Sequence, residues 1–77
     1  MLKTLLSMKK TIYVKILNEG TEVWRPVQAL KIENDIYKIT QETEFDEEWE
    51  FNCNELVHCI VSKNGSDKYL KAIKKAT

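Results

Sequence analysis

The residue types that could carry covalent or metal chemistry are few, and their spacing does not suit it. His58 and Cys59 are adjacent, so on an extended strand they point to opposite faces and cannot act as base and nucleophile. Cys53 and Cys59 have no second pair of ligands beside them, which is not the spacing of a zinc site. With two glycines in the chain, a glycine-rich phosphate loop is excluded. The sequence therefore predicts a protein that is not an enzyme and that uses no metal and no cofactor.

Acidic residues gather in one stretch of the chain. No Lys or Arg occurs between Lys38 and Lys63, and the acids in this interval are Glu42, Glu44, Asp46, Glu47, Glu48, Glu50 and Glu55. Like charges at this density repel one another and favour a cation or a basic partner. Their spacing does not match an EF-hand loop. A calcium or magnesium site is therefore the least favoured interpretation, and the two favoured ones are a solvated face and a docking surface for a basic protein.

The most distinctive motif is Trp24-Arg25-Pro26. A guanidinium beside an indole can recognise a partner's carboxylate or stack on a ligand. The alternative, which these residue types favour, is structural. In it Trp24 packs against Trp49 across neighbouring strands, and Arg25 pairs with an acid near Trp49, namely Glu47, Glu48 or Glu50. Both interpretations hold together if one edge of the group stays exposed.

The C-terminal part of the chain is basic, in contrast to the acidic stretch before it. Its lysines are Lys63, Lys68, Lys71, Lys74 and Lys75. Lysines could contact phosphates and Tyr69 could stack on a base, which would make the chain a nucleic-acid-binding barrel. Because no arginine and no second interleaved aromatic accompany them, we favour a solvated edge whose lysines discourage pairing with another sheet. Nucleic acid is thus the alternative partner.

Length and composition set the frame for these motifs. A chain of 77 residues makes one domain with a modest core, and a net charge of zero gives no global attraction to nucleic acid or membrane. Two cysteines are too few for the disulfide framework of a small secreted domain, which favours the cytoplasm. The sequence contains no run of 18 apolar residues, so we expect no membrane span.

Short runs of β-branched and aromatic residues, separated by turn residues, predict strands. Pro26 should bend the long second run, and Asn64-Gly65 predicts a hairpin. Trp49 opens a fourth strand or its approach. The expected strands are residues 11–17, 22–32, 36–40, 56–62 and 67–76, with a helix as the alternative for the last. Residues 1–9 are expected to be a loosely ordered extension, and residues 10–77 a single domain.

These elements predict an all-β fold, a small SH3-like barrel of five to six strands, because closure leaves no exposed sheet edge. The expected core contains Ile12, Val14, Ile16, Val27, Ala29, Ile39, Phe51, Val57, Cys59 and Val61.

Two segments also resemble a group of small, functionally uncharacterised bacterial proteins. The first is the run from Leu17 to Ala29, with the pattern EGT-x-VWRPV-x-A, and the second is the run from Asp46 to Phe51, which contains EEWEF. The similarity covers residues 10–62. It implies a bacterial origin and a small SH3-like barrel, and it implies no activity. The Asn52-Cys53-Asn54 turn departs from the Pro-Gly turn of that group.

The resulting expectation is a non-catalytic binding module that docks a protein partner with a basic surface. Its sharper form is an immunity or antitoxin-type inhibitor, because acidic proteins can block the basic active site of a nuclease by charge complementarity. The residues expected to bind the partner are Trp24, Arg25, Glu44, Asp46, Glu47, Glu48 and Trp49.

Overall fold

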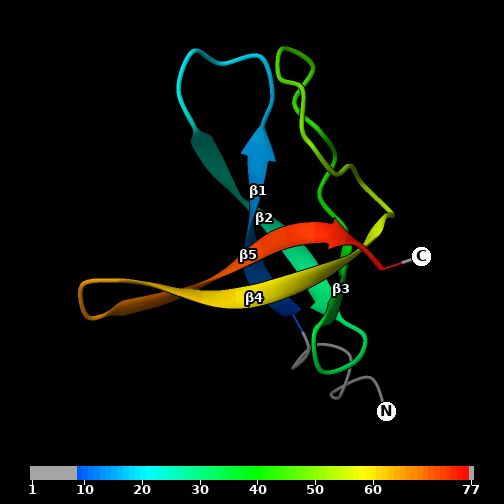
Figure 1. The fold of residues 1–77 in the computed structure, drawn as a ribbon. Helices are drawn as coiled ribbons and strands as arrows, with labels where there is room; N and C mark the ends of the chain where they lie inside the picture. The colour runs from blue at the N-terminus through cyan, green and yellow to red at the C-terminus, as the bar shows by residue number, and fades with distance from the viewer. Residues whose placement is uncertain (1–8, 77) are drawn as a thin grey trace.

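The computed structural model describes residues 9–76 and shows a closed barrel of five strands, β1 to β5, paired in chain order (Figure 1). Antiparallel pairing joins each strand to the next, and β1 and β5 close the ring by parallel pairing of Ile12 with Leu70 and Tyr13 with Lys71. The fold class is therefore the small all-β barrel that the sequence predicts. The strands are β1 (Lys9–Ile16), β2 (Val23–Lys31), β3 (Ile36–Ile39), β4 (Leu56–Asn64) and β5 (Asp67–Lys75).

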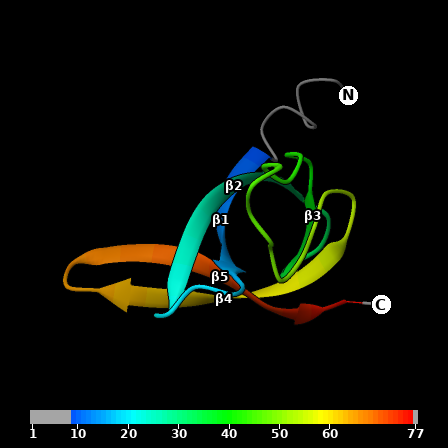
Figure 2. The same cartoon turned by 90° about the horizontal axis from the view of Figure 1, so that it is seen from above.

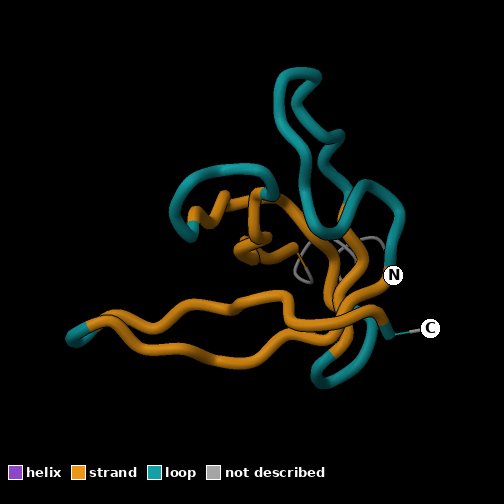
Figure 3. Tube along the Cα trace, turned by 45° about the horizontal axis from the view of Figure 1, so that its top comes forward, coloured by secondary structure: helices purple, strands orange, loops and turns teal. Residues whose placement is uncertain are grey.

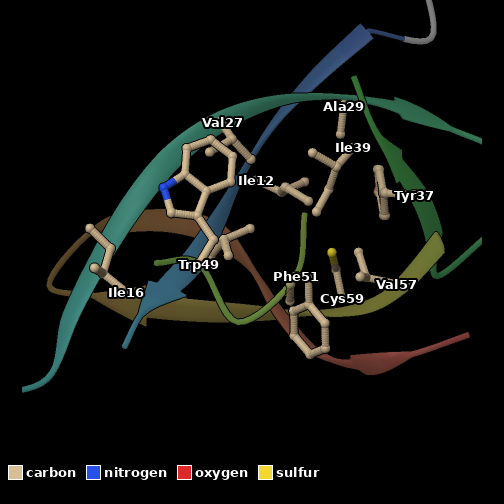
Figure 4. Close-up of a cluster of buried hydrophobic side chains, with 12 residues drawn as sticks. Ile12, Ile16, Val27, Ala29, Tyr37, Ile39, Trp49, Phe51, Val57 and Cys59 are labelled. Carbon is tan, nitrogen blue, oxygen red and sulfur yellow. The ribbon is translucent and has the colours of Figure 1, made fainter. Parts of the chain in front are cut away.

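Strand alternation builds the core (Figure 4). In an extended chain every second residue faces the same side, and β1 and β2 follow this rule from Ile12 to Ile16 and from Val27 to Ala29. Nine of the ten expected core residues are buried, and Tyr37, Trp49 and Ala72 join them. Tyr37 and Ile39 share the inner face of β3, and Ala72 lies on the inner face of β5. Trp49 and Phe51 lie outside the five strands and are buried on either side of exposed Glu50.

The tenth expected core residue, Val61, was wrong, because it is 61% exposed. Val61 pairs with Leu70, the residue at which β5 meets β1. Beyond this point β4 and β5 have no third strand beside them and continue as a two-stranded arm, which projects from the barrel (Figure 2). The alternation of apolar residues continues along β4 into the arm, but the closed barrel ends before it, so Val61 has no core to enter.

Turn residues set the ends of the arm and of the loops. Gly65, at the tip of the arm, has a φ of 67°, the left-handed value that hairpin turns of this length require and that glycine adopts without strain. Asn18 and Asn54 have positive φ values of 63° and 75°, which asparagine tolerates better than most residues.

Three further expectations meet the structure here. Residues 67–76 form a strand and not a helix, since β5 runs from Asp67 to Lys75. Trp49 makes only an isolated bridge to Ile16, so the strand count is five. The expected extension, residues 1–9, lies outside the described residues except for Lys9, which begins β1. The described part of the chain has no helix, and hence none long and apolar enough to cross a membrane.

Candidate functional site

Two loops rise side by side from one end of the barrel (Figures 1 and 3). One is the β1–β2 loop, residues 17–22, and the other is the acidic loop, residues 41–48. Backbone hydrogen bonds join them. The amide of Leu17 donates to the carbonyl of Glu48 at 2.6 Å, and the amide of Glu50 donates to the carbonyl of Lys15 at 2.9 Å. The acidic loop is therefore fixed to the end of β1 and does not hang free.

A single carboxylate, that of Glu47, anchors the acidic loop to the barrel. Glu47 Oε1 accepts a hydrogen bond from Arg25 Nε at 2.9 Å, and Glu47 Oε2 pairs with Arg25 Nη2. Glu47 Oε1 also accepts from the indole Nε1 of Trp49 at 2.8 Å. The guanidinium thus donates to both carboxylate oxygens, a bidentate geometry that a lysine could not reproduce. The same carboxylate satisfies the polar atom of a tryptophan that is otherwise buried in the core.

This arrangement shifts the acid–base behaviour of its members. The Arg25 guanidinium, and after it the Trp49 indole N–H, lower the pKa of the Glu47 carboxyl below its usual value. The hydrogen bond to Glu47 raises the pKa of Arg25. Both changes favour the ion pair, so Glu47 is charged and held in place at neutral pH.

The prediction that Arg25 pairs with one of Glu47, Glu48 or Glu50 is confirmed, and the partner is Glu47. Glu48 and Glu50 are exposed, and Glu48 instead accepts a hydrogen bond from the side-chain amide of Asn18.

We expect Arg25→Ala to lower the urea midpoint of unfolding clearly more than Lys31→Ala. Lys31 also lies on β2 and makes no ion pair among the described residues. Equal shifts in the two midpoints would mean that the ion pair does not hold the loop.

The lowered pKa of Glu47 predicts a pH dependence of stability. A carboxyl whose pKa is lower in the folded than in the unfolded state stabilises the fold above its unfolded pKa, near 4.5. That contribution is lost as the pH falls through the lower native pKa. We therefore expect the difference in unfolding free energy between the wild type and Glu47→Gln to be full at pH 7 and to shrink below pH 4.5. Urea unfolding at a series of pH values measures it.

The control for this series is Glu33→Gln, which removes the same charge from an exposed turn. A difference between wild type and Glu47→Gln that stays constant down to pH 3 would contradict the expected role of the charge.

The remaining acids of the loop face solvent. Glu42, Glu44, Asp46 and Glu48 are exposed, and exposed Glu19 and Glu22 lie in the β1–β2 loop beside them. Phe45 is 99% exposed in their midst. It lines a shallow hollow between the two loops together with Leu17, Asn18, Glu19, Asp46, Glu47 and Glu48.

Phe45 was missed in the sequence because an aromatic residue is expected to be buried, and nothing in its neighbours marks it as an exception. A fully exposed phenylalanine among carboxylates is the arrangement of a contact residue with an apolar centre and a charged rim. Of the four acids expected to bind a partner, Asp46 and Glu48 line the hollow with Phe45, Glu44 precedes Phe45 in the chain, and Glu47 anchors the loop that carries them.

The two tryptophans lie on opposite faces of the sheet. Trp24 stands on the outer face of β2, because Val27 and Ala29 face inward and Trp24 has the opposite alternation. Trp49 is 2% exposed and belongs to the core. The expected packing of Trp24 against Trp49 is therefore wrong. Trp49 supports the acidic loop from inside, and its side chain is not itself available as a binding surface.

The cysteines are both free thiols, and burial raises the pKa of the Cys59 thiol to about 12, so that it stays protonated. His58 and Cys59 alternate across β4, with only Cys59 in the core. Among residues 9–76 no group of three or more His, Cys, Asp or Glu side chains is arranged to hold a metal ion.

Comparison with known proteins gives no relative from which a function could be transferred. No protein-family model matches the chain, and neither a curated protein nor a solved structure matches it.

Proposed function

We propose that this protein is a non-catalytic binding module that docks a protein partner through the acidic loop. The observation that carries the proposal is Phe45, which is 99% exposed, stands between exposed Glu44 and Asp46 in the chain, and lines one hollow with Asp46 and Glu48. A partner of matching chemistry presents an apolar pocket with lysines or arginines around it. The acids speed encounter, and the aromatic ring fills the pocket.

The rigidity of the loop supports the same proposal. Its end is hydrogen-bonded to β1, its base is closed by the hydroxyl of Thr43 donating to Asn52 Oδ1 at 2.7 Å, and Glu47 is held by Arg25 and Trp49. A loop that is already ordered loses less conformational entropy on binding than a free one. The acids are thus presented in a fixed arrangement, as a surface selective for one partner requires.

The sharper form of the proposal is an immunity or antitoxin-type inhibitor. A nuclease binds a polyanion and therefore has a basic active site, which an acidic loop with a projecting ring could enter and block. We place this activity in the bacterial cytoplasm, an assignment supported by the two free thiols in a small chain.

The experiment compares two charge variants of equal size. The acidic variant carries Glu44→Gln, Asp46→Asn and Glu48→Gln and keeps Glu47, because Glu47 anchors the loop. The lysine variant carries Lys63→Gln, Lys68→Gln and Lys74→Gln on β4 and β5. The partner is first isolated from the native lysate on immobilised wild-type protein, and its association rate with each variant is then measured.

We expect the acidic variant to associate about ten-fold more slowly at low salt, and the lysine variant to associate at the wild-type rate. Salt should remove the difference, since exposed charges are screened beyond about 10 Å at 0.1 M. Loss of binding in the lysine variant, with normal binding in the acidic variant, would overturn the proposal.

A further inference from the structure

A second surface lies away from the acidic loop, on the outer face of three adjacent strands. It consists of Tyr13 on β1, Trp24 on β2, and Tyr69 and Lys71 on β5, and we call it the outer aromatic surface. β1 lies between the other two strands, with Lys15 opposite Trp24 and Tyr13 opposite Lys71. Tyr13 faces outward because its neighbours Ile12 and Val14 are buried, and Lys71 does so because Ala72 is buried.

The members of this surface touch one another in a row. The rings of Tyr13 and Tyr69 meet edge to face, with centroids 5.3 Å apart and planes at 71°. Lys71 Nζ lies 4.6 Å from the centre of the Trp24 ring and 5.6 Å from that of Tyr69. All four side chains are half-buried, so part of each remains accessible. Three aromatic rings and an ammonium group thus form one continuous surface drawn from three distant parts of the chain.

An open hollow of about 430 Å³ lies beside the two tyrosines, with Lys68 at its edge. Its lining is Tyr13, Asn64, Asp67, Lys68 and Tyr69. The tyrosine rings offer stacking faces, Asn64 and Asp67 offer hydrogen bonds to a base edge, and Lys68 offers a charge for a phosphate.

Two further observations concern groups near this surface that lack partners. Lys63 and Lys68 stand directly opposite each other in the β4–β5 register, on the face of the arm that alternates with Tyr69 and Lys71, and such a like-charge pair is unfavourable without an anion. Neither they nor Lys71 forms an ion pair within residues 9–76. The indole Nε1 of Trp24 is buried and has no hydrogen-bond acceptor in the described part of the chain, which costs free energy.

We infer that the outer aromatic surface binds single-stranded nucleic acid, with bases on Tyr13 and Tyr69 and phosphates beside Lys68 and Lys71. Movement of Lys71 from the Trp24 ring to a phosphate uncovers that ring for a further base. Aromatic faces accept any base, and lysines follow the backbone, so the expected binding has little sequence preference. An acidic polypeptide would satisfy the lysines but leave the rings without stacking partners.

The outer aromatic surface contains no residue of the acidic loop. Its aromatic character is not visible in the sequence, where the lysine run has one interleaved aromatic residue, Tyr69. The barrel supplies Tyr13 and Trp24 from other strands, because the parallel closure of β1 on β5 places them beside it.

The test uses the full chain and a fluorescein-labelled twelve-residue oligothymidylate as the probe, followed by anisotropy. Two or three phosphate contacts on a single strand predict affinity roughly ten-fold weaker at 200 mM than at 50 mM salt. Tryptophan emission gives a second signal, since stacking should quench half-buried Trp24 and leave buried Trp49 unchanged. Trp24→Phe should abolish the quenching while the anisotropy change remains.

The matched variants are Lys71→Gln and Lys74→Gln, which remove the same charge from the same strand, and only Lys71 lies over the rings. We expect Lys71→Gln and Tyr69→Ala each to weaken binding roughly ten-fold and Lys74→Gln to bind like the wild type. Circular dichroism checks that each variant keeps its fold.

Three results would overturn the inference. One is no anisotropy change at about 100 μM protein in 50 mM salt. Another is equal weakening by Lys71→Gln and Lys74→Gln, which would mean attraction by charge alone. The third is competition by polyglutamate as effective as that by unlabelled oligothymidylate, which would assign the surface to acidic polypeptides. The acidic variant of the loop should bind the probe as the wild type does, so the result does not depend on the proposed function.

Discussion

Trp49→Ala is expected to lower the free energy of unfolding by about 3–5 kcal/mol, the usual cost of truncating a large buried aromatic residue. A small domain has about 5–15 kcal/mol of total stability, so the variant should be close to unfolded. The indole is 2% exposed and lies among the core side chains (Figure 4), and Trp49 directly follows the acidic loop in the chain. Its removal also leaves Glu47 without the N–H that donates at 2.8 Å. Urea unfolding followed by circular dichroism measures the change.

Two companion variants separate the causes. Trp24→Ala removes the same side chain from the outer face of β2, where it is half-buried, and should cost less than half as much. Trp49→Phe keeps most of the apolar volume and removes only the N–H donor, so its effect should lie between those of the wild type and Trp49→Ala. If Trp24→Ala were as destabilising as Trp49→Ala, the core would not depend on Trp49 in the expected way.

The core could be predicted from the sequence because alternation is a local signal. Tyr37 stands two residues before Ile39, and Trp49 two residues before Phe51, so both could have been found by the same rule. Val61 obeys that rule and is nevertheless exposed. Val61 stands opposite Leu70, the last residue of β5 toward the tip of the arm that pairs with β1, so it lies where the closed barrel ends. The position of that end is set by the β1–β5 register.

The candidate site was predictable in part for the same reason. Opposite charges at Arg25 and around Trp49 indicate an ion pair, but the choice of Glu47 depends on how the loop turns back toward β2. The row formed by Tyr13, Trp24 and Tyr69 was not predictable, because each residue comes from a different strand and only the closed barrel brings them together. Non-local register has no counterpart in local sequence patterns.

Phe45 carries the second large expected effect. If the acidic loop docks a basic protein, Phe45→Ala should weaken binding to the native partner about 30-fold, the loss of about 2 kcal/mol expected for an aromatic anchor. Because the ring is 99% exposed, the substitution should leave the urea midpoint unchanged. A core residue would behave differently, because its truncation would lower the stability of the fold as well as the affinity.

The kinetics distinguish the ring from the charges around it. Phe45→Ala should act on the dissociation rate and be little affected by salt, since apolar contacts form after encounter. The acidic variant should act on the association rate and depend on salt. Phe45→Tyr, which keeps the ring, is the matched control and should bind within a few-fold of the wild type. If Phe45→Ala dissociates as slowly as the wild type while the acidic variant still associates slowly, the loop attracts its partner by charge alone and the ring does not anchor it. If neither variant changes either rate, the partner binds elsewhere on the barrel, and the acidic loop is only a solvated surface.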